Sequence, residues 1–245
     1  EELKNLFNLL IDITDNYYHY PTFFDKIYRI LQYFSNDIKT KFTKSEIFDI
    51  FKENRQILLF LFQNKILELD ESFIKKVIKH KELSNIKSTY SLYSCTKSYY
   101  GKSKQKRIEK EITKNYDPNI SSFEEKCKKG ENDSFLSQLI RNDSIEDFVS
   151  FLSRTNISLL TQIAHSIYDT NKELIMNNLS LIEYAAFFGS FQIFQYLYLN
   201  NVPLTPSLWL YSIHGRNPMI IHLLEENNIT PKNNNYDDCL FCAIK

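Results

Sequence analysis

The feature that most constrains this chain is a pattern that occurs twice near its C-terminal end. Sliding the segment 181–202 along the sequence by 26 positions brings Gly189 onto Gly215 and Leu197 onto Leu223. Each copy predicts two short apolar helices joined by a tight turn. Helical pairs that repeat in this way stack into a solenoid, and solenoids present extended surfaces for binding other macromolecules.

The residues of the first copy suit a stacked helical pair. Ala185 and Ala186 allow neighbouring helices to approach closely, and Gly189 can adopt the left-handed conformation that ends a helix. The second copy has Tyr211 where an alanine is expected, and Pro218 stands in the first turn of its second helix, where proline is tolerated. An apolar stripe marks the second helix of the first copy: Phe191, Phe194, Leu197 and Tyr198.

Further units are predicted on both sides of these two copies. An upstream unit over 134–153 aligns with the first copy at an offset of 46 and places Asp143 at the position of Gly189. The extra residues between them, 154–178, are interpreted as an insertion. A last unit begins at Asp237, and we expect it to be truncated by the end of the chain.

This pattern resembles the ankyrin repeat. Segments 182–186 (Ile-Glu-Tyr-Ala-Ala) and 213–217 (Ile-His-Gly-Arg-Asn) are similar to a divergent ankyrin-repeat family of the DUF3447 type, which is expanded in parasitic protists. The resemblance covers 178–245 and extends in outline to 134–178. It implies an intracellular scaffold that binds proteins, and it implies no chemistry.

One departure from the ankyrin pattern directs attention to the helices. Ankyrin units usually repeat at 33 residues, whereas the spacing here is 26, so the hairpin loops between units must be shortened. In ankyrin repeats the two residues before the turn glycine often face the partner. These are Phe187 and Phe188 in the first copy, and Ile213 and His214 in the second.

Two more residues join the predicted binding surface. Trp209 is the only tryptophan, Arg216 lies in a turn, and both residue types are enriched at interface hot spots. Packing between repeats is the alternative role for Trp209 and Phe188. The predicted protein-binding residues are Phe188, Trp209, His214 and Arg216.

The rest of the chain also predicts helices. Apolar residues recur at helical spacing over 1–18 and 22–34, and Thr43 with Glu46 matches a capping box. Only four glycines are present, which disfavours a turn-rich β-sandwich or barrel. We therefore predict an all-α protein, a helical array followed by ankyrin-like α-solenoid repeats. Its predicted parts are an N-terminal helical array (1–100), a charged linker (101–122) and an ankyrin-like repeat domain (123–245).

A basic segment, 99–110, provides an alternative function. Five basic residues follow two tyrosines there: Tyr99, Tyr100, Lys102, Lys104, Lys106, Arg107 and Lys110. Basic residues interleaved with aromatic ones are typical of nucleic-acid-binding segments. Glu109 and Glu111 cancel part of this charge, so a solvated helix or a mobile linker is favoured and nucleic acid is not the expected partner.

No pattern in the chain predicts catalysis or a cofactor. Cys239 and Cys242 have the spacing of half a zinc site, but no second pair accompanies them, and on a helix they are simply small apolar residues. No phosphate-binding or nucleophile motif occurs. We therefore expect no enzyme activity, no metal and no cofactor.

Charge and hydropathy bear on location. The 30 acidic and 30 basic side chains cancel, so no global field favours nucleic acid or an anionic membrane. No apolar run is long enough to cross a bilayer. We expect a protein partner in the cytoplasm.

Overall fold

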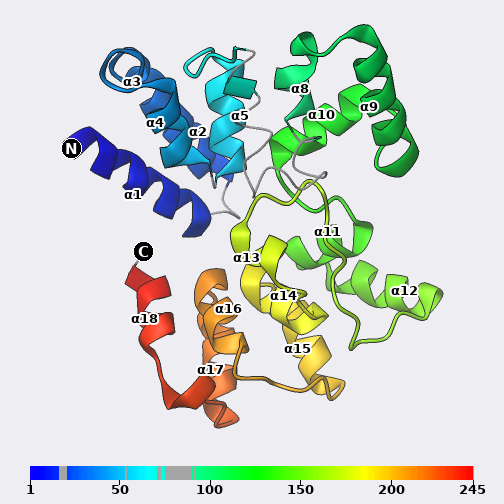
Figure 1. The fold of residues 1–245 in the computed structure, drawn as a ribbon. Coiled ribbons are helices and arrows are strands. Elements are labelled where there is room, and N and C mark those ends of the chain that lie inside the picture. Colours follow the sequence, from blue (N-terminus) through cyan, green and yellow to red (C-terminus); the bar gives the residue numbers. More distant parts are fainter. Residues whose placement is uncertain (17–20, 53, 71–72, 75–89, 91, 245) are drawn as a thin grey trace. The chain divides into compact units, whose positions relative to one another are not determined.

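The computed structural model is built from α-helices, and it describes residues 1–245 apart from 17–20, 53, 71–72, 75–89, 91 and 245 (Figure 1). Among the described residues no β-strand forms, which confirms the predicted all-α class. The chain divides into two compact units. Unit 1 comprises 1–131 and 166–172, and unit 2 comprises 132–165 and 173–245. The stretch 75–89, inside the expected N-terminal array, lies outside the described residues.

Unit 1 contains two groups of helices, each with its own core. The first group is α1 (Glu2–Asn16), α2 (Pro21–Tyr33), α3 (Ser35–Lys41), α4 (Lys44–Phe51) and α5 (Arg55–Gln63). Its core includes Phe7, Leu31, Phe48, Phe51 and Leu61. The second group is α8 (Tyr93–Thr96), the 3-10 turn η1 (Lys97–Tyr99), α9 (Lys102–Asn115) and α10 (Ile120–Lys129).

The capping box predicted at the start of α4 is present. The Thr43 hydroxyl accepts a hydrogen bond from the Glu46 backbone N–H at 3.3 Å, and the Thr43 backbone N–H donates to the Glu46 carboxylate at 2.8 Å. These bonds satisfy two backbone donors that a helix start would otherwise leave unpaired.

The expected linker over 101–122 is folded instead. It supplies all of α9, whose Ile108 and Ile112 pack into a core with Tyr93, Phe123 and other residues of unit 1. Two isoleucines four positions apart lie on the same side of a helix, which is enough to attach a highly charged helix to a core. The segment is therefore part of unit 1.

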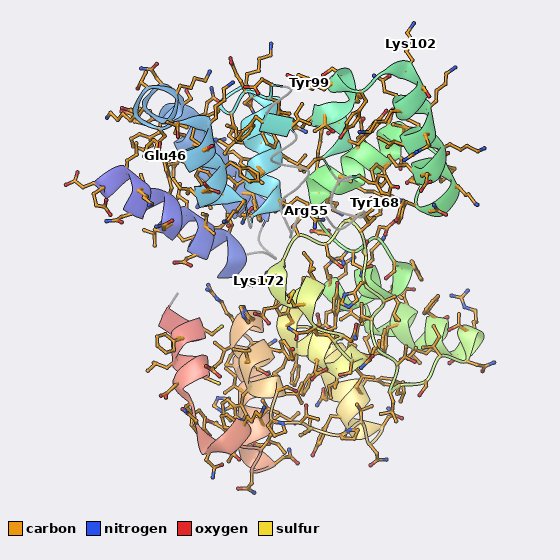
Figure 2. The ribbon with its side chains drawn as sticks, viewed as in Figure 1. Glu46, Arg55, Tyr99, Lys102, Tyr168 and Lys172 are labelled. Carbon is orange, nitrogen blue, oxygen red and sulfur yellow. The ribbon has the colours of Figure 1, made fainter. Side chains whose placement is uncertain are left out.

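A return segment, 166–172, completes this second core of unit 1. Tyr168 packs against Phe123 with ring centroids 5.5 Å apart. Figure 2 labels Arg55 and Tyr168. Arg55 donates hydrogen bonds to the backbone oxygens of Ile167 and Asp169 at 3.1 and 3.3 Å. The Thr170 hydroxyl donates to the carbonyl of Gly130 at 3.1 Å. The expected insertion over 154–178 thus contains a segment that belongs to unit 1.

Unit 2 is a series of helical pairs. Their bounds are α11 (Phe135–Arg141) with α12 (Ile145–Thr155), α14 (Leu181–Phe188) with α15 (Phe191–Leu199), and α16 (Leu208–Gly215) with α17 (Pro218–Glu226). The short α13 (Lys172–Met176) precedes the second pair, and η2 (Lys232–Asn234) and α18 (Asp237–Ile244) follow the third. First helices contact first helices along the series α11, α14, α16, α18, and second helices contact along α12, α15, α17 (Figure 1).

Each pair turns at a residue with left-handed backbone. The turn residues are Asp143 with φ 50°, Gly189 with φ 68° and Arg216 with φ 52°. The prediction for Asp143 is confirmed. The pairing of Gly189 with Gly215 was wrong by one position, because Arg216 is the equivalent of Gly189 and the offset is 27.

Gly215 serves a different purpose from a turn glycine. It is the last residue of α16, and a Cβ there would collide with the carbonyl oxygen of Ala186 and lie 2.7 Å from the backbone nitrogen of Gly189. The backbones of α14 and α16 are therefore in direct contact at this point. The close approach expected at Ala185 and Ala186 is present at the backbone of Ala186, against Gly215.

We expect Gly215→Ala to lower the free energy of unfolding by about 1–3 kcal/mol, the usual cost of forcing extra atoms into a packed core. Alanine is otherwise the better helix former, so a loss of stability identifies the clash and not helix propensity as the cause. Urea denaturation measures the change. Gly101→Ala is the control, because nothing lies within 4 Å of its added Cβ; equal effects at both sites would contradict the close approach.

Asp143 also joins two pairs. Its carboxylate accepts hydrogen bonds from the backbone N–H groups of Gln192 and Ile193, at 3.0 and 2.9 Å, in the first turn of α15. It therefore caps a helix that belongs to the next pair along the chain.

Replacing Asp143 with alanine removes the carboxylate that caps α15. Alanine, like aspartate, carries a Cβ, so position 143 would still hold a residue with a Cβ in the left-handed backbone conformation. We expect a loss of about 1–2 kcal/mol in the free energy of unfolding, as at other helix caps. Asp143→Asn keeps one acceptor oxygen and tolerates the left-handed backbone, so it should lose less. Thermal melts of the two variants compare them directly, and an asparagine variant as unstable as the alanine variant would argue against capping.

Candidate functional site

The ends of the first helices in unit 2 bring together a row of aromatic and cationic side chains. We call this row, Arg141, Tyr184, Phe187, Phe188 and His214, the aromatic ladder. Arg141 lies at the end of α11, the next three residues lie on α14, and His214 lies on α16. Three consecutive helical pairs therefore each contribute to one continuous row.

Arg141 makes the first step of the ladder. Its guanidinium donates a hydrogen bond to the Tyr184 hydroxyl at 3.1 Å and lies 5.9 Å from the centre of the Phe188 ring. The Tyr184 and Phe188 rings are 4.7 Å apart. A cation over an aromatic face is attracted by the ring quadrupole, so Arg141 holds Phe188 in place while both remain half-exposed.

Phe187 links the second pair to the third. It is fully buried, and its ring centre lies 5.1 Å from that of Phe188 and 5.1 Å from that of His214. The two partly exposed rings therefore rest on one buried ring, which fixes their separation without any loop.

His214 is held neutral by this position. Burial, and to a smaller extent the positive charge of Arg216, lower the pKa of its imidazole from 6.5 to about 4. At neutral pH the ladder thus presents an uncharged imidazole next to an exposed arginine.

The four predicted binding residues separate into two groups. Phe188 and His214 meet on Phe187, and the exposed Arg216 follows His214 within two residues. Trp209 is only 6% exposed; its indole N–H donates to the Ile229 carbonyl at 2.8 Å and its ring packs edge-on against Tyr236. Trp209 packs inside unit 2, and we leave it out of the candidate surface.

Sequence reasoning did not include Arg141 in this surface. The offset of 46 that aligned the upstream unit places Arg141 at the position of Phe187, so the signal was present. The predicted offset of 26 between the two C-terminal copies, one residue too small, also paired Phe187 with Ile213. The structure pairs Phe187 with His214, which lies 27 positions further along.

Other expected features occupy ordinary structural positions. Cys239 is buried and Cys242 half-buried on α18. Within the described ranges, no group of three or more His, Cys, Asp or Glu side chains is arranged to hold a metal ion. The described helices are also all too short or too polar to cross a membrane.

Comparisons of this chain with protein families, with curated proteins and with solved structures found no significant match.

The neutral state of His214 makes stability depend on pH. Unfolding restores its ordinary pKa near 6.5, so between pH 6.5 and about 4 the unfolded chain binds a proton that the folded chain does not. The neutral His214 therefore leaves the free energy of unfolding at its full value above pH 6.5, and the free energy of unfolding decreases as the pH falls from 6.5 toward 4. We expect His214→Gln to reduce the acid loss of stability by about 1–2 kcal/mol.

Two measurements check this pH dependence. Urea denaturation at pH 7 and pH 4.5 compares the parent with His214→Gln, and an NMR titration of the histidine ring protons gives the pKa directly. The same loss in both proteins, or a His214 pKa near 6.5, would contradict the assignment.

Proposed function

We propose that unit 2 is a short ankyrin-like solenoid and that it works as a non-catalytic protein-interaction module inside the cell. Support for the solenoid comes from three successive helical pairs whose turns fall at Asp143, Gly189 and Arg216, and whose first helices contact each other in order. The resemblance of 178–245 to the DUF3447-type ankyrin family agrees with this assignment. The cysteines of the chain lack the spacing of a disulfide framework, which suits a reducing compartment.

The observation that carries the proposed function is the aromatic ladder. Arg141, Phe188 and His214 lie in one row at the ends of the first helices of three pairs. Arg141 and His214 occupy the position equivalent to Phe187, and Phe188 is the residue that follows it. These side chains are already held by Tyr184 and Phe187, so binding would order few of them. A surface organised before binding loses little conformational entropy in the complex.

The chemistry of the ladder suggests the kind of protein segment it binds. Arg141 supplies positive charge at one end of the ladder, and Arg216, two residues after His214 in the chain, supplies it next to the ladder. Phe188 and neutral His214 supply aromatic rings between these charges in chain order. A segment with carboxylates on either side of an apolar side chain would match this order. Arginine and aromatic side chains are also the types that dominate interface energetics.

The test is affinity capture from the source cell's lysate. We expect the parent chain to retain specific proteins that Phe188→Ala/His214→Ala/Arg216→Ala loses. The matched control is Gln195→Ala/Met219→Ala/Glu226→Ala, which changes three exposed residues on the second helices and should retain the same proteins. Circular dichroism and thermal melts must show equal folding in all three chains.

Each outcome has a defined meaning for the proposal. Loss in the ladder variant alone supports binding at the ladder. Equal capture by parent and ladder variant would remove the ladder as the binding surface. A parent that captures nothing above background would remove the interaction function itself.

A further inference from the structure

Helix α9 of unit 1 separates its charges onto different sides. Four lysines recur at intervals of four residues and are all exposed: Lys102, Lys106, Lys110 and Lys114. With 3.6 residues per turn, this spacing places them on one side of the helix, and the exposed Arg107 lies beside them. Figure 2 shows Lys102 pointing away from the rest of unit 1. We call these five residues the basic stripe.

The two glutamates of α9 lie at the edges of its buried side. Glu109 accepts a hydrogen bond from the Tyr93 hydroxyl at 2.8 Å, and Glu111 accepts one from Tyr90 at 3.0 Å. Burial, followed by these carboxylates, raises the pKa of both tyrosines, so the hydroxyls remain donors. Both carboxylates are therefore engaged by tyrosine hydroxyls at the edges of the basic stripe.

Within the part of the chain that the structure describes, no ion pair involves any of the five residues of the basic stripe. Five like charges kept on one surface cost electrostatic free energy unless a counter-charge joins them. Such an arrangement favours an anionic ligand of extended shape.

The helix that carries the stripe is firmly attached. Ile108 and Ile112 are buried in the core of unit 1. The Gln105 amide donates hydrogen bonds to the carbonyls of Lys97 and Tyr100, and the ammonium of Lys104 lies 4.2 Å from the centre of the Tyr100 ring. The stripe therefore keeps its orientation with or without a ligand.

We propose that the basic stripe binds the phosphate backbone of a nucleic acid. Each four-residue step along an α-helix advances about 6 Å, so Lys102 to Lys114 extend over about 18 Å. Nucleic acid is a polyanion with regularly spaced charges over such a distance, and lysines that neutralise phosphates release bound counterions. The exposed Tyr99, 44% accessible, lies just before the stripe and offers a ring for base stacking in a single strand.

A lipid surface fits these observations less well. Helices that bind membranes do so by burying an apolar face among the lipids, in addition to charge attraction. The apolar face of α9 is already buried against unit 1, so only charge attraction is left. A repeated row of cations on a rigid helix suits a rigid row of phosphates better than a fluid surface.

Fluorescence anisotropy with a labelled DNA duplex of about 20 base pairs, and with a single-stranded RNA of the same length, tests the proposal. With four phosphates neutralised, duplex affinity should fall about 100-fold between 50 and 200 mM salt. Lys102→Gln/Lys106→Gln/Lys110→Gln should bind at least about tenfold more weakly and lower the salt slope by about 3. Glutamine preserves helix propensity, and circular dichroism verifies the fold.

The control keeps the same net charge change elsewhere in unit 1. Lys4→Gln/Lys39→Gln/Lys65→Gln replaces three exposed lysines outside α9 and should bind like the parent. Equal weakening in both variants, or no binding at 50 mM salt, would overturn the proposal. Binding to phosphatidylserine vesicles without binding to either nucleic acid would overturn it in favour of a membrane. Because the stripe and the aromatic ladder share no residue, either can fail without the other.

Discussion

The direct backbone contact between Gly215 and the Ala186–Gly189 turn is the constraint on which the rest of unit 2 depends. Neither Gly215 nor Gly189 accepts a Cβ without collision, so the ends of α14 and α16 are held at one fixed separation. That separation places Phe187 beneath both Phe188 and His214. The candidate binding surface is therefore a consequence of backbone packing, and its geometry needs no long loop.

Hydrogen bonds between successive turns reinforce this contact. Asp143 caps α15, Ser190 donates to the Ile140 carbonyl at 2.5 Å, and Asn217 donates to the Gly189 carbonyl at 2.8 Å. Each of these bonds joins one helical pair to the next through backbone groups that a sharp turn would leave unpaired. These bonds connect the helical pairs of unit 2 to one another in chain order.

Local patterns in the sequence predicted the helical elements well. The capping box of Thr43 and Glu46 and the proline at the start of α17 depend on residues within one turn of each other. The left-handed Asp143 followed from its alignment with Gly189. The choice of Phe188 and His214 as binding residues rested on their positions before the turns, and their binding role stays a prediction. Trp209 is buried, as in the alternative role of packing between repeats, through contacts with Ile229 and Tyr236, which lie at least 20 residues away.

The sequence by itself determined the all-α class, the helical pairs and local caps such as the capping box of Thr43 and Glu46, because those features follow from neighbouring residues. Tertiary structure alone decided three matters. It set the offset between the second and third helical pairs at 27. Gly215, which contacts the backbone of Ala186 and Gly189, is the last helical residue of α16, so the turn falls at Arg216. It turned Glu109 and Glu111 toward tyrosines, leaving a basic stripe on the outside of α9. It lowered the pKa of His214, because burial depends on side chains that only packing brings together.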